Sequence, residues 1–272
     1  MKSIPFSKLV LGAVAMLAAT TGDAAPAPKP DADQIIRQMS AKLATARQFS
    51  FRAHRESRGA ALPGLGVPED ARIAVTARRP NEFVAKSTSK GDVRDIYFDG
   101  RTLTIFDAAK NFYSTAPMRT SIDGLLAQIQ AKYGFTPPLG ELAASDVYAD
   151  IRHKTQSISY VGRSRVAAGF LGLGGVECER VHLPGKGVDA ELWVALHDQL
   201  PRKLVVTFKN HPGQPKLTAE ISDWNLDAKG SDQSFLFHAP KGAMQIPMKT
   251  TAEMNAARSH PQSKKKAKRA VG

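Results

Sequence analysis

Histidine is the first place to look for chemistry in this chain, because its imidazole titrates near neutral pH and binds metal ions. No two histidines form an H-x-H or H-x-x-x-H pair, the local spacings that bring two imidazoles to one metal ion. Ligands contributed by distant strands remain an alternative, but no cluster points to them. The sequence therefore predicts no metal site and no cofactor. The seven histidines are His54, His153, His182, His197, His211, His238 and His260.

Other catalytic patterns are missing from the sequence as well. It contains no G-x-S-x-G elbow and no serine with a suggestive histidine or aspartate nearby. Asp92, Asp95 and Asp99 lie near predicted turns, where aspartate commonly bonds to backbone N–H groups. The pair Asp99–Gly100 is typical of a type I′ hairpin turn, which requires positive φ angles. We therefore expect a protein that is not an enzyme.

A glycine-rich segment, "VAAGFLGLGGVEC" (Val166 to Cys178), looks at first like a phosphate-binding loop. Its spacing fits neither nucleotide motif, and it joins two strands instead of a strand and a helix. We interpret it as a hairpin loop. Apolar residues at its tip would suit contact with a lipid surface or a partner. These candidates are Phe170, Leu171 and Leu173, and Gly59–Pro68 is a second loop of the same character.

Cys178 is the only cysteine, so an internal disulfide is excluded. Within "GVECERVHL" it is predicted to be a small buried strand residue. The alternative, a reactive thiol or an intermolecular disulfide, lacks an evident activating base nearby.

The two ends of the chain are predicted to lie outside the folded domain. Residues 1–24 have a basic start, the apolar run "LVLGAVAMLAA" and small residues before Ala24, which together are typical of a cleaved signal peptide. Residues 25–30 form a proline-rich leader.

Residues 249–272 form a basic tail that we expect to be disordered. Lys264, Lys265 and Lys266 in that tail suit anionic phosphates, and for an exported protein a lipid surface is a better candidate than nucleic acid. A tail that only aids solubility is an equal alternative.

Residues 31–248 are expected to form one domain. Twelve short segments alternate or are rich in β-branched and aromatic residues, which predicts successive antiparallel strands. They are 49–57, 71–78, 82–89, 93–98, 102–107, 111–116, 157–162, 178–183, 189–196, 201–209, 215–225 and 234–239.

Helical patterns interrupt the strands at three places. A helix is expected after Asp31 or Asp33, with an apolar stripe from Ile35 to Ala46. A second should begin after Ser121 and end at Gly134. Residues 137–154 predict a weaker helix or two short turns. The result is an α+β fold on an antiparallel sheet of about eleven or twelve strands, which should curl and be covered by helices on its concave face.

The order of these segments resembles a family of predicted periplasmic proteins of unknown function from Gram-negative bacteria, grouped with the lipoprotein-carrier-like (LolA-like) superfamily. The "YFDG" turn, the "YG" that ends the central helix and "LPRKLV" carry the resemblance, which covers roughly residues 32–246. It implies a periplasmic location and a half-open antiparallel β-barrel whose apolar concave side is covered by helices. It supplies no catalytic residues, and the two glycine-rich loops depart from its pattern.

Two functions follow from this resemblance combined with the period-two pattern of the strands. The first is a binding or carrier protein with an apolar cavity for the acyl chains of a lipid or lipoprotein. The second is an envelope interaction or stress-sensor protein with a filled core, which binds a protein or an anionic membrane surface through its rim loops and basic tail. Apolar pattern alone does not separate a cavity from a core. The candidate cavity residues are Phe83, Ile96, Phe98, Leu103, Ile105, Tyr113, Leu125, Leu126 and Ile129.

Overall fold

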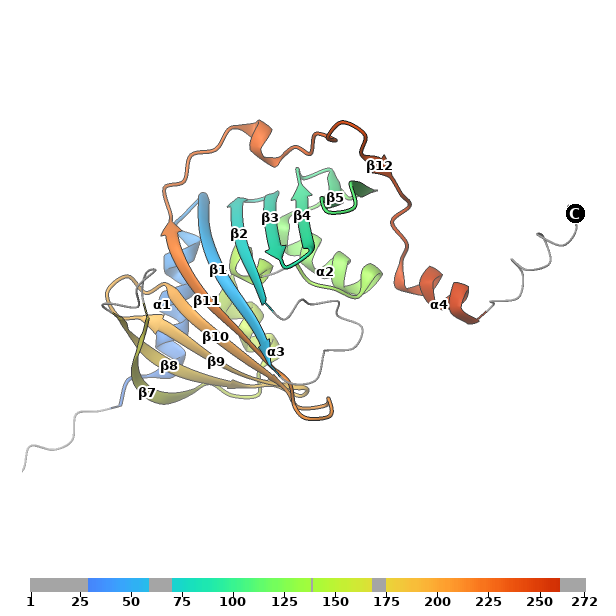
Figure 1. Cartoon of the computed structure of the whole chain (residues 1–272). Helices are drawn as coiled ribbons and strands as arrows, with labels where there is room; N and C mark the ends of the chain where they lie inside the picture. Colours follow the sequence, from blue (N-terminus) through green and yellow to red (C-terminus); the bar gives the residue numbers. More distant parts are fainter. Residues whose placement is uncertain (1–28, 59–69, 138, 168–174, 260–272) are drawn as a thin grey trace, which may run out of the picture.

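A computed structural model describes residues 29–58, 70–137, 139–167 and 175–259. Its centre is a curled sheet of twelve strands in the order β12-β6-β5-β4-β3-β2-β1-β11-β10-β9-β8-β7. All neighbouring strands are antiparallel except β12 and β6, which are parallel. Helices α1, α2 and α3 lie together on one side of the sheet (Figure 1). We call this side the inner face. The predicted α+β class with an extended antiparallel sheet is confirmed.

The described elements follow the chain in a simple order. The strands are β1 (Gln48–Arg58), β2 (Asp70–Arg78), β3 (Glu82–Ser89), β4 (Asp92–Phe98), β5 (Thr102–Asp107), β6 (Phe112–Pro117), β7 (Ser159–Val166), β8 (Val176–Pro184), β9 (Val188–Ala195), β10 (Pro201–Phe208), β11 (Lys216–Asn225) and β12 (Met244–Gln245). The helices are α1 (Ala32–Ala44), α2 (Ile122–Tyr133), α3 (Val147–Lys154) and α4 (Thr251–Ser259), with 3₁₀ turns η1 (Gly140–Ala143) and η2 (Asp232–Phe235).

Local chemistry explains where the helices start and stop. The Asp31 carboxylate accepts a hydrogen bond from the backbone N–H of Asp33 and caps α1. The Ser121 hydroxyl likewise accepts one from the N–H of Gly124 at the start of α2. Gly134 ends α2 with φ of 70°, a left-handed angle that glycine adopts without a Cβ clash. The caps expected at Ser121 and Gly134 are confirmed, and Asp31 is the cap of the first helix.

The core lies between the inner face and the helices. Strand β2 shows the alternation clearly, because Ala71, Ile73, Val75 and Ala77 are buried while the residues between them are more exposed. From the helices, Ile36, Met39 and Leu43 of α1 and Leu125 and Ile129 of α2 are fully buried in the same cluster.

Two predictions about turns and strands are wrong. Gly100 has φ of 83°, but Asp99 does not have a positive φ, so the turn is not type I′. Instead the Asp99 carboxylate accepts hydrogen bonds from the N–H groups of Arg101 and Thr102, which stabilises a longer three-residue loop. The strand expected at 234–239 does not form either. The last described strand is β12, further along the chain.

The segment that was predicted as a strand instead belongs to a strap, residues 226–250, which arcs past the ends of strands β1 to β4 on its way to β12 (Figure 1). Its contact with the outer face of the sheet is made by Phe237. The ring of Phe237 lies 5.5 Å from Tyr97, 5.4 Å from Phe106 and 5.1 Å from Tyr113 (centroid distances). The strap ends by pairing with β6, since the N–H of Ile246 donates to the carbonyl of Tyr113. The strap therefore covers both a face and an edge of the sheet.

Part of the predicted disordered tail is helical. Residues 251–259, expected to belong to a disordered tail, form helix α4. The remaining tail, the predicted signal peptide, most of the leader and both glycine-rich loop tips lie outside the described residues.

The strap anchor can be tested at Phe235, which is 1 % exposed and lies under the guanidinium of Arg78 at 4.9 Å. We expect Phe235→Ala to lower the free energy of unfolding by about 3 kcal/mol, because a buried aromatic ring is replaced by a cavity. Urea denaturation measures this. Met244→Ala, at an exposed strap position, is the control and should change stability by less than about 0.5 kcal/mol. Equal effects of the two substitutions would contradict the anchoring role.

Candidate functional site

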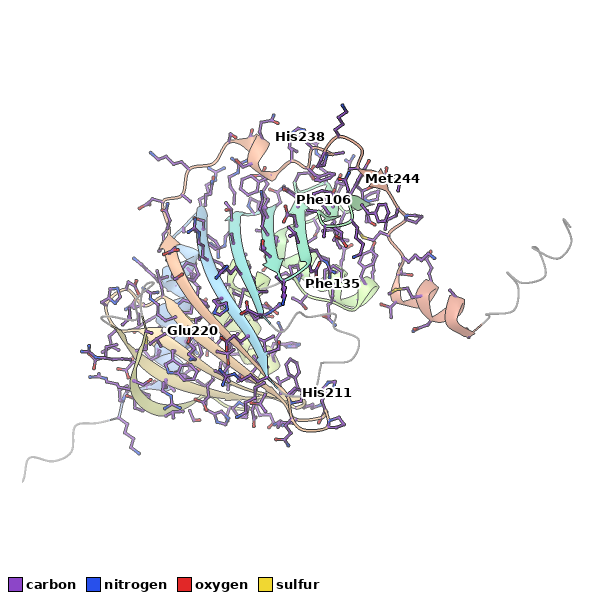
Figure 2. All side chains as sticks on the ribbon, in the orientation of Figure 1. Phe106, Phe135, His211, Glu220, His238 and Met244 are labelled. Carbon is purple, nitrogen blue, oxygen red and sulfur yellow. The ribbon has the colours of Figure 1, made fainter. Side chains whose placement is uncertain are left out.

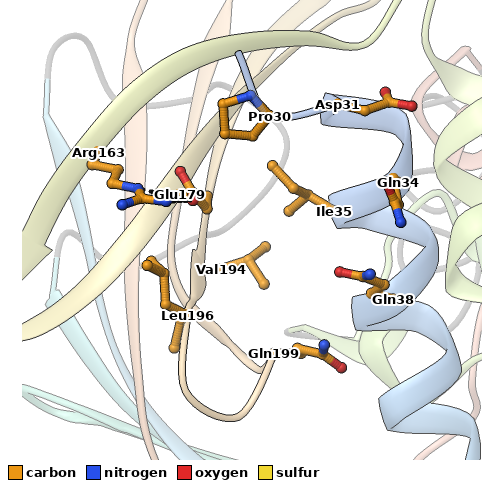
Figure 3. Close-up of a pocket in the computed structure, with 11 residues that line it drawn as sticks. Pro30, Asp31, Gln34, Ile35, Gln38, Arg163, Glu179, Val194, Leu196 and Gln199 are labelled. Carbon is orange, nitrogen blue, oxygen red and sulfur yellow. Dashed lines mark hydrogen bonds and ion pairs between the residues drawn. The ribbon is translucent and has the colours of Figure 1, made fainter. Parts of the chain in front are cut away.

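The candidate site is a pocket between the N-terminal half of α1 and strands β7–β9, which we call the α1 pocket. Its volume is about 300 Å³. Ile35 enters it from the helix, and Val194 and Leu196 enter it from the sheet side (Figure 3). The lining residues are Pro30, Asp31, Gln34, Ile35, Gln38, Arg163, Glu179, Val194, Ala195, Leu196 and Gln199.

Helix α1 serves both the core and the pocket because its side chains point in different directions. Ile36, Met39 and Leu43 are fully buried against the sheet. Ile35 is half-buried, and Gln38 one turn later is exposed. The pocket wall is therefore apolar at Ile35 and polar but uncharged at the glutamine, an arrangement that suits an amphiphilic group.

A buried carboxylate stands at the sheet side of the pocket. Glu179 is only 9 % exposed. It accepts hydrogen bonds of 2.6 Å from the hydroxyl of Tyr160 and of 3.0 Å from Nε of Arg163. Nη2 of Arg163 forms an ion pair with it at 2.9 Å. Burial and the bond to Glu179 raise the pKa of Tyr160. The bond to Glu179 also raises the pKa of Arg163. The carboxylate is held by two donors, so it is placed as a structural ion pair and not as a free base.

A β-bulge makes this triple contact possible. Residues three apart on a regular strand point to opposite faces. The register of β7 against β8 shifts between Tyr160 and Gly162, where φ of Gly162 is 144°. The extra residue brings Tyr160 and Arg163 to the same inner face, opposite Val181 and Glu179 respectively. The bulge thus builds one wall of the α1 pocket.

The predicted cavity residues lie elsewhere, in the half of the sheet that α2 covers. Most are buried in the core cluster, and none lines the α1 pocket. Phe83, Phe98, Leu103, Leu125 and Ile129 are 0 % exposed, Ile96 is 4 % exposed, and Ile105 and Leu126 are half-buried against them. Ligand binding by these eight residues stays a prediction.

Tyr113 is a correction to that set. It was expected to share a face with Leu103 and Ile105, but β6 pairs Tyr113 with Phe106 and Ser114 with Ile105. Tyr113 therefore lies on the outer face, against Phe237 of the strap. Figure 2 shows the side chains of the described residues on the whole ribbon, with Phe106 of this aromatic group labelled.

The remaining predicted site residues cannot be placed in the fold. Phe170, Leu171, Leu173, Lys264, Lys265 and Lys266 lie outside the described residues.

Cys178 is fully buried on β8, in agreement with the expectation of a small strand residue. Burial raises the pKa of its thiol to about 11, so the nucleophilic thiolate is scarce at neutral pH.

Metal clusters and membrane-spanning helices are both absent from the described part of the chain. Among those residues, no group of three or more His, Cys, Asp and Glu side chains could hold a metal ion. None of their helices is long and apolar enough to cross a membrane.

The α1 pocket is not among the sites predicted from the sequence, which lie on strands within residues 82–116 and on the central helix. The one available signal was Gln34 and Gln38, two uncharged polar residues spaced i, i+4 beside an apolar stripe. That signal is weak, since such residues are also ordinary on solvated helices.

Arg79 holds α1 in place. Its Nη1 donates to the carbonyls of Leu43 and Ala46, at 2.9 and 2.8 Å, and its Nη2 donates to the carbonyl of Ala144 at 2.9 Å. The guanidinium also lies 4.8 Å from the ring of Phe49. One side chain thus ties the end of α1 and the η1–α3 junction to the turn between β2 and β3.

We expect Arg79→Met to lower the free energy of unfolding by about 3 kcal/mol, because three backbone carbonyls lose a charged donor and remain partly buried. Chemical denaturation measures the change. Arg47→Met is the matched control, since Arg47 is exposed and lies next to the same turn. If both variants were equally stable, the three hydrogen bonds would not hold α1.

Solved structures that match this chain have low sequence identity to it and TM-scores below 0.5. An uncharacterized conserved protein from Thermus thermophilus has 11% identity, with 80% of this chain and 100% of that chain covered and a TM-score of 0.47. A chain of the Pseudomonas aeruginosa MucA/MucB complex has 16% identity, 77% and 62% coverage and a TM-score of 0.43. A LolA superfamily protein from Nitrosomonas europaea has 13% identity, 76% and 99% coverage and a TM-score of 0.37.

Sequence comparison gives a firmer result. No curated protein matches the chain. The family described as "Predicted periplasmic protein (DUF2092)" matches residues 32–249, which include every described strand and α1 to α3. The periplasmic location and the family expected from "YFDG", "YG" and "LPRKLV" agree with this match. The chain belongs to the DUF2092 family of predicted periplasmic proteins.

Proposed function

We propose that this protein is a non-catalytic binding protein of the periplasm, and that its α1 pocket takes the apolar part of an amphiphile such as the acyl chain of a lipid or lipoprotein. The observation that carries the proposal is the pocket itself. It is a hollow of about 300 Å³ on the inner face, beside the core cluster that α2 covers. This volume lies at the lower end of the usual range of roughly 300–1,000 Å³ for small-molecule sites.

The lining supports an amphiphile better than a fully polar ligand. Ile35, Val194 and Leu196 offer apolar surface, and each methylene buried against such surface contributes about 0.8 kcal/mol. Gln34, Gln38 and Gln199 offer amide donors and acceptors at the rim. The Glu179 carboxylate is neutralised by Arg163, so it does not repel a negatively charged head group strongly.

A longer chain would need the helices to move, and the contacts indicate how. The hydroxyl of Tyr148 on α3 donates to Asp33 on α1 at 2.9 Å, and the guanidinium of Arg37 lies 3.9 Å from the ring of Tyr148. Helices α1 and α3 are therefore joined side to side. In the proposed mechanism they move together as one cover, with Arg79 at the hinge end, and the pocket widens beneath them.

A second candidate function is binding of an envelope protein, which is favoured by the position of β7. Among the described strands, β7 ends the sheet and pairs with β8 alone. Val161 at its bulge is 45 % exposed, and Leu196 at the α1 pocket is 38 % exposed. A strand edge beside exposed apolar side chains can accept an added strand from a partner.

Filling the α1 pocket tests the first function. We expect Gln38→Trp to lower the affinity for a fluorescent fatty acid at least about tenfold, because the indole occupies the hollow that the chain would enter. Fluorescence titration of the purified protein measures this, with native mass spectrometry to detect bound lipid. Ala41→Trp is the control, since Ala41 is exposed on α1 and does not line the pocket. Uptake that is absent from the wild type, or equal in the two variants, would count against the proposal.

Site-specific photo-crosslinking tests the second function. A benzoylphenylalanine at Val161 should crosslink in the periplasm to one defined protein, because β7 would lie within contact distance of its partner. The same group at exposed Lys90, in the turn between β3 and β4, should not. A crosslinking pattern that is the same at both positions would remove the support for a partner at β7.

A further inference from the structure

Arg55 of β1 is a charged residue on the inner face of the sheet. Phe51, Ala53 and Arg55 alternate along the strand, with exposures of 1, 5 and 7 %. Because side chains two residues apart share a face, the Arg55 side chain points to the side that carries the core. The next residue on the same face is Ser57.

Arg55 has no partner within the described part of the chain. It takes part in no hydrogen bond or ion pair there, its Nε is buried without an acceptor, and the hydroxyl of Ser57 is buried without a partner too. Two half-buried arginines are different. Arg79 donates to three carbonyls, and Arg78 binds the carboxylates of Glu82 and Asp232.

A charged side chain with a buried, unpaired Nε is costly, and arginine cannot escape that cost by losing its proton. Burial lowers the pKa of Arg55. The group nevertheless remains charged, since arginine is not deprotonated in proteins. Desolvating an ion without a counterion costs several kcal/mol. A bound anion would offset this cost, and the Ser57 hydroxyl beside it could donate to the same anion.

The neighbours of Arg55 on the inner face are small residues. Arg55 pairs across the sheet with Ala71 of β2 and with Ala219 of β11, and Ala53 precedes it on its own face. All three alanines are buried. Their methyl groups occupy little of the space that larger inner-face residues would fill.

The rows of the sheet connect Arg55 to the α1 pocket. Arg55 pairs with Ala219, Ala219 with Leu204, and Leu204 with Leu192. At about 4.8 Å between neighbouring strands, Leu192 lies roughly 14 Å from Arg55 along this row. Val194 of the α1 pocket is two residues further along β9, on the same face. An apolar row thus runs from the charge to the pocket.

We infer that Arg55, assisted by Ser57, binds the anionic carboxylate or phosphate group of an amphiphile whose chain lies along Leu204 and Leu192 toward the α1 pocket. This inference rests on the proposed binding of amphiphiles, and it adds the charge of the ligand and the residue that selects it.

The test compares probes that share a chain and differ in charge. Oleate, oleyl alcohol and oleoyl-lysophosphatidate are titrated by calorimetry into the wild-type protein, Arg55→Met, Arg55→Lys and the control Arg52→Met. Arg52 is on the same strand but is exposed on the outer face, 3.6 Å from Asp223. We expect the wild type and Arg52→Met to bind the anions at least about tenfold more tightly than the alcohol, a difference of about 1.4 kcal/mol. Arg55→Met should lose this preference and still bind the alcohol, while Arg55→Lys should keep part of it.

Melting curves separate a binding role from a structural one. Without ligand, Arg55→Met should melt at the same temperature as the wild type or higher, because an unpaired buried charge is removed. If Arg55→Met instead melts at a lower temperature and loses affinity for all three probes equally, Arg55 has a structural role and the inference is overturned. An unchanged preference for anions in Arg55→Met would overturn it as well.

Two outcomes distinguish this inference from the function on which it rests. If the wild type binds oleyl alcohol and oleate equally, the inference fails and the proposed function stands. If it binds none of the three probes, both fail. Inorganic phosphate is the last probe. If it binds the wild type as tightly as lysophosphatidate does, and Arg55→Met does not bind it, Arg55 forms an anion site whose ligand is a free anion and not the head group of an amphiphile.

Discussion

The hydrogen bonds from Arg79 to the carbonyls of Leu43, Ala46 and Ala144 hold the cover of an open sheet in place. A curled sheet of twelve strands has an apolar inner face that must be shielded from water. Helices cover it, but the last backbone carbonyls of a helix have no hydrogen-bond donor within the helix and need one from elsewhere. The planar guanidinium supplies several donors at once in a fixed geometry. This side chain, together with the buried face of α1, fixes the position of the helix and with it the α1 pocket.

Three buried or half-buried arginines show three ways of treating a charge in this fold. Arg79 is neutralised by backbone dipoles, and Arg78 by the carboxylates of Glu82 and Asp232. Arg55 has neither within the described residues. The contrast matters because all three lie on adjacent strands or turns near the same core. The fold pairs its other two arginines, so the absence of a partner at Arg55 among the described residues supports the anion site that we infer there.

Much of the fold could be predicted because its signals are local. Alternation identified eleven of the strands, and Ser121 and Gly134 marked the ends of α2 by hydrogen bonding and backbone angle.

The errors arose where distant parts of the chain meet. Residues 234–239 have the composition of a strand, but the aromatic cluster at Phe237 holds them on the outer face. Tyr113 was misplaced because its face depends on register with β5, not on its own neighbours. The α1 pocket joins residues about 160 positions apart, and no local pattern reports that.

The pairing of β1 with β11 has a kinetic consequence. These strands join Ser50 to Asn225 and Arg58 to Lys216, and they connect the two halves of the sheet. When the N-terminal part of the chain becomes available first, the hairpins of β2 to β6 can form early, because each turn there is short. The chain cannot join the halves until residue 225 is free. Contacts so far apart in sequence slow folding and leave the apolar face of each half unprotected for longer. The central seam of the sheet is therefore the step at which the unfinished protein is most exposed to aggregation or to a chaperone.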